Sequence, residues 1–151
     1  MLLDPRTLEA WTPKALAALR AVSGYLFLQH GSAKLFGMPH VATFDNVQLM
    51  SLIGIAGVLE LVLGSLLLIG LFVRPAAFLA SGEMAVAYFT AHATRGHVLL
   101  PILNNGELAV LYCFVFLFLA VAGAGHWNVD ALRQRGRTAS FAGRDPMRSA
   151  S

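Results

Sequence analysis

The chain has 151 residues, of which 57% are apolar and only 13% are charged, with a formal net charge of +3. Soluble domains average roughly 45–50% apolar and 25% charged residues, so a soluble domain of this size would have too few charges to cover its surface. The apolar content also excludes a disordered chain, and the single cysteine, Cys113, excludes a disulfide scaffold and a cysteine-based zinc finger. Length and composition therefore favour an integral membrane protein.

The first 14 residues mix apolar and polar side chains. Leu2, Leu3, Leu8 and Trp11 stand among polar neighbours, a pattern typical of a short helix lying at the membrane interface. Thr12 followed by Pro13 predicts an N-cap and the first residue of a helix. A first membrane span is therefore expected over 15–36.

Three further windows are long and apolar enough to cross about 30 Å of hydrocarbon, which takes roughly 20 residues. They cover 49–72, 76–93 and 105–124, and the Arg74-Pro75 pair separates the second from the third. The sequence thus predicts an all-α, integral membrane four-helix bundle over 15–130. A basic, disordered tail is expected over 131–151.

Basic residues predict the orientation of this bundle. Lys34 and Arg95 fall on one side of the membrane, and the other nine of the 11 Lys and Arg residues fall on the side that holds both termini. The positive-inside rule then places both termini in the cytoplasm, as in a multi-pass protein of the bacterial inner membrane. The basic tail is explained as a topology signal that touches anionic lipid, which removes the nucleic-acid interpretation.

Two carboxylates lie inside the predicted spans, where ionisable groups are costly and often functional. Glu60 shares a helix face with Gly57 and Gly64, which allow a neighbouring helix to approach closely, so Glu60 is expected to point into the bundle. Glu83 lies on a similar face, beside small residues that include Ala80. The structural alternative for both is a protonated side chain that makes a hydrogen bond between packed helices.

The remaining candidates lie toward the outer leaflet. His30 and Lys34 share a face of the first span, although Lys34 could simply reach the interface and His30 could be a packing residue. His92 lies at the outer end of the third span, nine residues after Glu83. Glu107 fits either a site role or a capping box with Asn104 as N-cap.

This distribution predicts one polar pocket open to the outer face. Lys34 with Glu107 is expected to form an outer ion pair, and Glu60 with His30 a deeper hydrogen-bonded pair. Glu83 completes the pocket, with His92 and Asn105 at its rim. The pocket fits a binding or transport protein for a small polar or metal species, and a structural subunit that anchors a soluble enzyme is the alternative.

At these residues the chain resembles the DoxX family of small four-helix bacterial membrane proteins. The resemblance covers roughly residues 20–130. It rests on the runs Gly24-Tyr25-Leu26-Phe27-Leu28-Gln29-His30-Gly31, Lys34-Leu35-Phe36-Gly37, Gly57-Val58-Leu59-Glu60, Met84-Ala85-Val86-Ala87-Tyr88-Phe89, Asn105-Gly106-Glu107-Leu108-Ala109 and Gly123-Ala124-Gly125-His126-Trp127-Asn128-Val129-Asp130. The family's closing motif more often has Pro and Ser where this chain has Ala124 and Asn128.

The resemblance implies a role beside membrane redox enzymes, since relatives are linked to thiosulfate:quinone oxidoreductase and to complexes that handle oxidative or thiol stress. On that interpretation Glu60, His30 and Glu83 are the candidate catalytic groups of an oxidoreductase subunit. The candidate cofactor-binding residues are His30, Lys34, Glu60, Glu107, His92 and Asn105. A quinone is the first candidate cofactor, ahead of a non-covalent haem or a divalent metal. Lipid, a redox partner protein and a second copy of the chain are the candidate partners.

Overall fold

The computed structural model of this protein describes residues 4–131, which fold into helices joined by short loops. Four long helices form the fold: α1 (Pro5–Phe36), α2 (Leu52–Ile69), α3 (Val73–Ala87) and α5 (Glu107–Ala122). Short helical turns connect them: η1 (Ala42–Phe44), the π-helical η2 (Tyr88–His92), η3 (Ala93–Arg95) and α4 (Pro101–Asn104). Residues 4–131 contain no strand, so the predicted all-α class is confirmed. The predicted basic tail lies outside the described residues from position 132 onward.

The first helix begins much earlier than predicted. It starts at Pro5, and Pro13 lies inside it, so Thr12 is not an N-cap. Its hydroxyl instead donates to the carbonyl of Leu8 at 2.7 Å. Proline removes one backbone N–H from the helix, and the carbonyl left without that bond belongs to Glu9, which lies in an exposed turn where water can satisfy it. Residues 5–14 are therefore continuous with the predicted first span.

The second and third helices begin and end at recognisable caps. The hydroxyl of Ser51 accepts the N–H of Gly54 at 3.1 Å and caps the start of α2. Gly70 ends α2 with a positive φ of 74°, a conformation that favours glycine. The next helix starts at Val73, so the predicted break at Arg74-Pro75 is wrong. Pro75 lies in the first turn of α3, where its missing N–H costs no helical bond.

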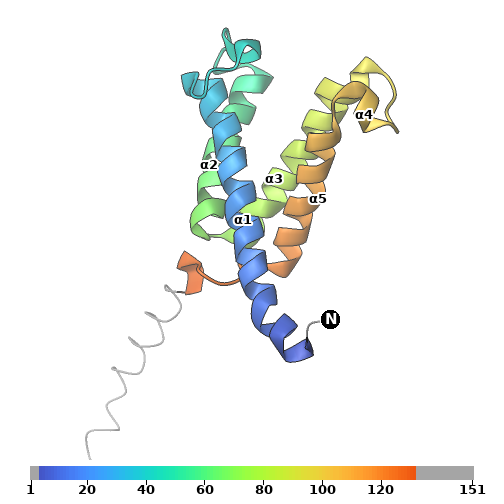
Figure 1. Cartoon of the computed structure of the whole chain (residues 1–151). Coiled ribbons are helices and arrows are strands. Elements are labelled where there is room, and N and C mark those ends of the chain that lie inside the picture. Colours follow the sequence, from blue (N-terminus) through green and yellow to red (C-terminus); the bar gives the residue numbers. More distant parts are fainter. Residues whose placement is uncertain (1–3, 132–151) are drawn as a thin grey trace, which may run out of the picture.

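The four long helices form two pairs that diverge. α1 lies beside α2 and α3 lies beside α5, and the pairs meet at one end and separate at the other (Figure 1). We call the separated end, which carries η1 and α4, the open end. The opposite end, which carries the turn at residues 70–72 and the segment 123–131, is the closed end.

Glycines bring α1 and α2 into backbone contact. A Cβ atom on Gly31 would lie 2.6 Å from the carbonyl oxygen of Gly57, and one on Gly64 would lie 2.6 Å from the backbone nitrogen of Leu28. No larger residue fits at such separations, which real Cβ atoms essentially never show. The expectation that Gly57 and Gly64 allow a close helix approach is therefore confirmed.

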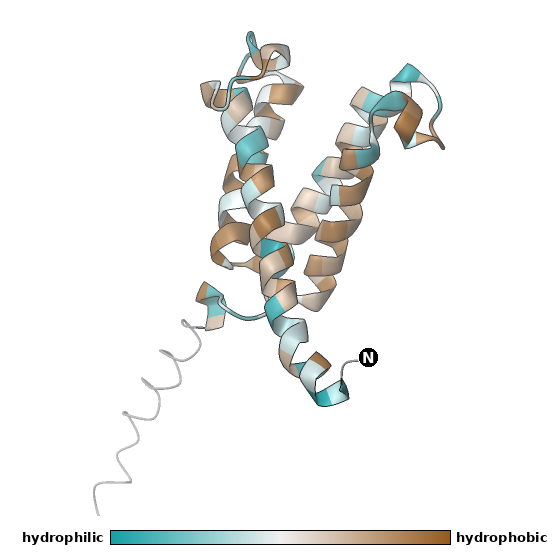
Figure 2. Cartoon of the chain, in the orientation of Figure 1, coloured by the Kyte–Doolittle hydropathy of each residue, from teal (hydrophilic) through white to brown (hydrophobic). Residues whose placement is uncertain are grey.

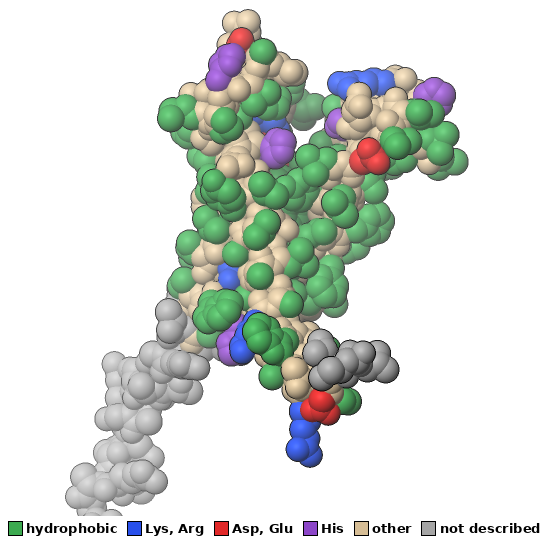
Figure 3. All heavy atoms as spheres, in the orientation of Figure 1, with side chains coloured by type: hydrophobic (Ala, Val, Ile, Leu, Met, Phe, Trp, Pro, Cys, Tyr) green, Lys and Arg blue, Asp and Glu red, His purple; other side chains and the backbone are tan. Residues whose placement is uncertain are grey.

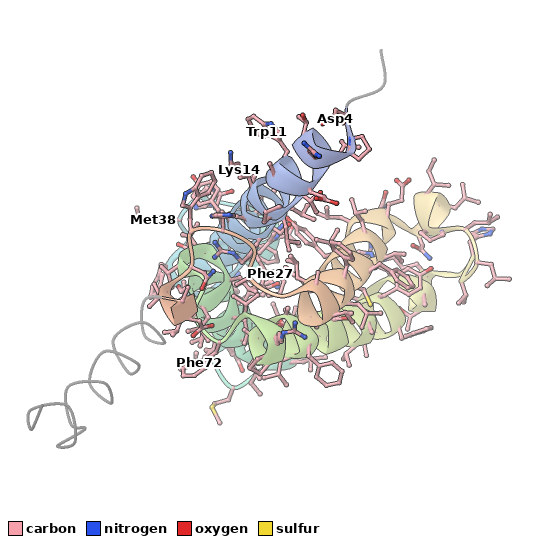
Figure 4. The ribbon with its side chains drawn as sticks, turned by 90° about the horizontal axis from the view of Figure 1, so that it is seen from below. Asp4, Trp11, Lys14, Phe27, Met38 and Phe72 are labelled. Atoms are coloured by element: carbon pink, nitrogen blue, oxygen red, sulfur yellow. The ribbon has the colours of Figure 1, made fainter. Side chains whose placement is uncertain are left out.

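The core lies where the two pairs meet. Phe27 of α1 points between the helices (Figure 4) and packs against two rings of α5, with ring centroids 6.0 Å from Tyr112 and 4.8 Å from Phe116. Leu63 and Leu67 of α2 join this cluster from the other side. All five side chains are buried, so an apolar layer separates the open end from the closed end.

Large apolar side chains also cover much of the outside of the bundle, and hydrophobic residues predominate along α2 and α5 in Figure 2. Exposed large apolar side chains on α5 alone are Leu108, Leu111, Phe114, Leu117, Phe118 and Val121. Within the described part of the chain, one helix, Leu52–Ile69, is both long and apolar enough to cross a membrane, while Glu107–Ala122 is apolar but shorter. The four predicted spans thus correspond to four helices. One of these helices, α2, has the length and composition expected of a membrane span.

Candidate functional site

A buried ion pair joins α1 to α2. The Nζ atom of Lys34, in the last turn of α1, lies 2.6 Å from Oε1 of Glu60, in the middle of α2. Their side chains are only 12% and 3% exposed. Glu60 therefore points into the bundle, as its spacing from Gly57 and Gly64 predicted.

A second carboxylate lies nearby without a partner. Both oxygens of Glu83, from α3, are buried and accept no hydrogen bond from residues 4–131, and the same holds for Oε2 of Glu60. Glu83 makes no direct contact with the ion pair, but it lies within electrostatic range of Glu60 and Lys34. We call Lys34, Glu60 and Glu83 the ionic cluster. It contains one cation and two carboxyl groups, so it is neutral when one of the two carboxyl groups carries a proton.

His30 lies one turn before Lys34 on the same helix, half-buried, and the charge of Lys34 acts on it. Its ring makes no hydrogen bond with any described residue, so the predicted Glu60–His30 pair is wrong. The reason lies in Gly57, because its missing side chain leaves room for the Lys34 stem. A Cβ atom at Gly57 would lie only 3.0 Å from Cβ of Lys34. Because glycine has no such atom, the lysine side chain can lie across α2 and pair with Glu60 in place of His30.

Two other candidates lie outside the ionic cluster. Glu107 is the exposed first residue of α5, and its predicted ion pair with Lys34 is wrong because Lys34 binds Glu60. The predicted capping box is wrong as well, since Gly106 is the N-cap and Asn104 instead ends α4. Asn105 is exposed and has a left-handed backbone with φ of 58°, which ends that short helix.

His92 belongs to a second polar group, at the open end of the α3–α5 pair. Its Nδ1 atom lies 3.2 Å from the carbonyl of Asn104, and its ring stacks on Tyr88 with centroids 6.3 Å apart. The amide of Asn104, which is 1% exposed, donates to the Tyr88 hydroxyl and to the carbonyls of Gly96 and His97. These contacts hold the loop 96–104 against the π-helical turn, a structural role that sequence reasoning missed.

Sequence reasoning also missed Arg20. This buried arginine has no carboxylate partner among the described residues, and its guanidinium instead donates to four backbone carbonyls at 2.6–3.2 Å. Two of the carbonyls end α2, at Leu67 and Leu68, and two follow α5, at Ala124 and Trp127. The negative ends of the helix dipoles stabilise its charge. Arg20 therefore ties three segments together at the closed end.

A pocket of about 190 Å³ opens beside the ionic cluster at the open end. Its walls come from the last turn of α1 and the loop after it: Ala33, Lys34, Leu35, Gly37, Val41, Phe44, Asp45 and Val47. The Phe44 ring covers Lys34, with its centroid 5.5 Å from Nζ. The space-filling view also shows the surface hollowed between the two helix pairs at this end (Figure 3).

The cluster provides few ligands for a metal. Across residues 4–131, no three His, Cys, Asp or Glu side chains converge on one point as a metal site requires. Two buried carboxyl groups, an ammonium and a half-buried imidazole are instead a set of hydrogen-bonding and proton-binding groups. They suit a small organic ligand that donates hydrogen bonds.

Comparison with known proteins places these residues in a family. The DoxX family profile matches residues 15–93, a range that contains His30, Lys34, Glu60 and Glu83. An uncharacterized protein of Haemophilus influenzae is 45% identical over 125 residues, which cover 82% of this chain and 93% of that protein. No solved structure matches the chain.

Proposed function

The chain belongs to the membrane-associated DoxX family, and we propose that it is an integral membrane subunit of a redox system that binds a quinol headgroup at its ionic cluster. The proposal has three parts: the chain spans the bacterial inner membrane, the cluster faces its outer half, and the unpartnered carboxylate oxygens bind the headgroup. Each part has its own support.

The apolar exterior supports the membrane-spanning part. Large side chains such as Phe78, Leu111 and Phe114 are more than half exposed on the middle of their helices, where water would make them unfavourable. Leu52–Ile69 is long enough to span. The shorter α5, with 16 residues, would cross a locally thinned stretch of the bilayer. Lipid is then the partner of the whole outer surface.

The basic residues support the orientation. Of those described, Arg6, Lys14, Arg20 and Arg74 lie toward the closed end, and Lys34 and Arg95 toward the open end. The positive-inside rule places the closed end in the cytoplasm. The ionic cluster and the pocket beside it then face the outer leaflet.

The three unpartnered oxygens of Glu60 and Glu83 carry the proposal for the ligand. A buried acceptor without a donor costs about 1–3 kcal/mol, and more when it is charged, so a ligand that donates hydrogen bonds to these oxygens would stabilise the site. A quinol carries hydroxyl donors, and when bound it supplies protons and electrons. Glu83 is placed to accept a hydroxyl hydrogen bond and then its proton. Lys34 holds Glu60 fixed and offsets the negative charge of one ionised carboxylate.

The aromatic layer below the cluster supports a flat ring as the ligand. Phe27 lies one turn closer to the closed end than His30 and Gly31, and it packs against Tyr112 and Phe116. The two α5 rings are stacked, with centroids 5.4 Å apart. The three rings are at most 7% exposed and form the floor beneath the cluster, so a planar headgroup above them would rest on aromatic atoms. The residues of this chain handle protons, and a partner redox protein takes the electrons.

Binding of a soluble quinol tests the proposal. The full chain in lipid nanodiscs is titrated with decylubiquinol by calorimetry, beside the variants Glu83→Gln and Glu107→Gln. We expect Glu83→Gln to weaken binding at least tenfold, because an amide replaces one acceptor with a donor. Glu107→Gln is the matched control and should bind like the unmodified chain, since Glu107 is exposed and outside the cluster.

Two results would reject the proposal. If the unmodified chain binds no quinol, the chain is better explained as a structural anchor or as a binding protein for another small molecule. If Glu83→Gln binds as well as the unmodified chain, the quinol binds elsewhere.

A further inference from the structure

We infer that the carboxyl groups of the ionic cluster exchange protons with the outer side alone, through the pocket lined by Lys34 and Phe44. This inference rests on the orientation given under Proposed function, but not on quinol binding. It assigns the pocket a role as a proton access route.

The first step is the contact between the pocket and the cluster. The pocket of about 190 Å³ has room for several water molecules. Lys34 belongs to its wall and also donates to Glu60 at 2.6 Å, so one side chain joins the pocket to the buried carboxylate. Beyond that contact, three carboxyl oxygens accept no hydrogen bond from a described residue and are free to take up a proton: Oε2 of Glu60 and both oxygens of Glu83.

The second step is the mouth of the pocket. Asp45 lines it, and Nε2 of His40 lies 2.8 Å from Oδ1 of Asp45. Both side chains are well exposed, at 49% for Asp45 and 72% for His40. The mouth of the pocket therefore carries a hydrogen-bonded acid–imidazole pair that is in contact with solvent.

The third step is the seal on the other side. Phe27, Leu63 and Phe116 lie toward the closed end from the cluster, and each is at most 5% exposed. Below them the guanidinium of Arg20 donates to four backbone carbonyls. An apolar layer of this kind holds no continuous chain of water or titratable groups, so protons have no route from the cytoplasmic side.

The titratable groups at and around the cluster come from three helices. α1 provides His30 and Lys34, α2 provides Glu60 and α3 provides Glu83, while Tyr112 of α5 belongs to the aromatic layer beneath them. Among these, only Lys34 also lines the pocket. Proton exchange with the outside therefore depends on the space next to Lys34.

A plug in the pocket tests this route. In a Cys113→Ser background, Phe44→Cys is reacted with a bulky sulfonated maleimide that does not cross membranes. Infrared spectroscopy then follows the hydrogen–deuterium exchange of the protonated carboxyl band. This band is assigned to the ionic cluster because Glu83→Gln or Glu60→Gln removes it. Thr94→Cys, at an exposed position on the α3–α5 pair, is the matched control plug.

We expect the plug at position 44 to slow carboxyl exchange at least tenfold and the plug at position 94 to leave it unchanged. Equal exchange rates with both plugs would overturn the route. The absence of any exchanging carboxyl band that depends on Glu60 or Glu83 would overturn it as well. Neither result changes the quinol titration, so this inference and the proposed function can fail separately.

Discussion

Lys34 and Glu60 are 26 positions apart in the chain, yet their charged atoms lie 2.6 Å apart and almost out of contact with solvent. Their pairing depends on Gly57, which lets the lysine stem lie against α2. A buried ion pair adds little net stability, but removing one partner leaves a buried charge. The pair is therefore best tested by removing its two members singly and together.

We predict that Lys34→Met destabilises the chain by about 3–5 kcal/mol, the usual cost of breaking a buried pair. Methionine keeps an unbranched stem but leaves Glu60 without its cation. The double variant Lys34→Met, Glu60→Gln should recover most of the loss, because no unpaired charge remains on this pair. Thermal unfolding in detergent measures both. Equal stability of the single and double variants would mean that loss of the Lys34 cation does not leave a destabilising charge on Glu60.

The glycine contact between α1 and α2 makes a second prediction. Gly64→Ala should destabilise the chain by about 1–3 kcal/mol, since its methyl group would lie 2.6 Å from the backbone nitrogen of Leu28 and 2.8 Å from the carbonyl oxygen of Gly24. Backbone atoms cannot move aside as a side chain can. The control is Gly82→Ala, which meets no atom within 4 Å in helix α3 and should be neutral or stabilising by up to about 1 kcal/mol. Similar unfolding temperatures for the two variants would contradict close packing at Gly64.

Arg20 provides a third prediction at the closed end. Arg20→Met should destabilise the chain by at least about 3 kcal/mol, because hydrogen bonds from a charged donor contribute roughly 1.5–3 kcal/mol each. Arg20→Lys should recover only part of the loss, since an ammonium cannot reach four carbonyls on two segments as the planar guanidinium does. Unfolding of each variant is compared with Arg74→Met, which changes an exposed arginine. Full rescue by lysine would show that charge alone matters at this position.

The orientation is the fourth prediction. A reporter that is active only in the cytoplasm should be active when fused after Ser151, and inactive when inserted at Gly96, in the exposed loop of the open end. A second reporter, active only outside the cytoplasm, should give the opposite pattern. The reverse result at both positions would invert the proposed topology and place the ionic cluster toward the cytoplasm.

Local sequence patterns predicted the helices and the direction of Glu60, because periodicity and glycine spacing are properties of one helix. They did not predict the partner of Lys34, which depends on how α1 and α2 lie against each other. Arg20 could not be found either, since its acceptors come from segments up to 107 positions away. The error at Glu107 has a local cause: α4 ends on Asn104, so the residue expected to cap α5 belongs to the preceding turn.

Asn104 gives the last prediction, because its amide holds the loop at the open end. Asn104→Asp has nearly the same shape but loses the donor that serves the Tyr88 hydroxyl and the carbonyls of Gly96 and His97. It would also bury a carboxylate at a position that is 1% exposed. We expect faster proteolytic cleavage within 96–104 and a loss of about 1–3 kcal/mol in stability. Asn105→Asp is the matched control, since the neighbouring side chain is exposed and donates to no described residue. Because the loop belongs to the α3–α5 pair, quinol binding at the ionic cluster should survive Asn104→Asp, and its loss would mean that the loop contributes to the site.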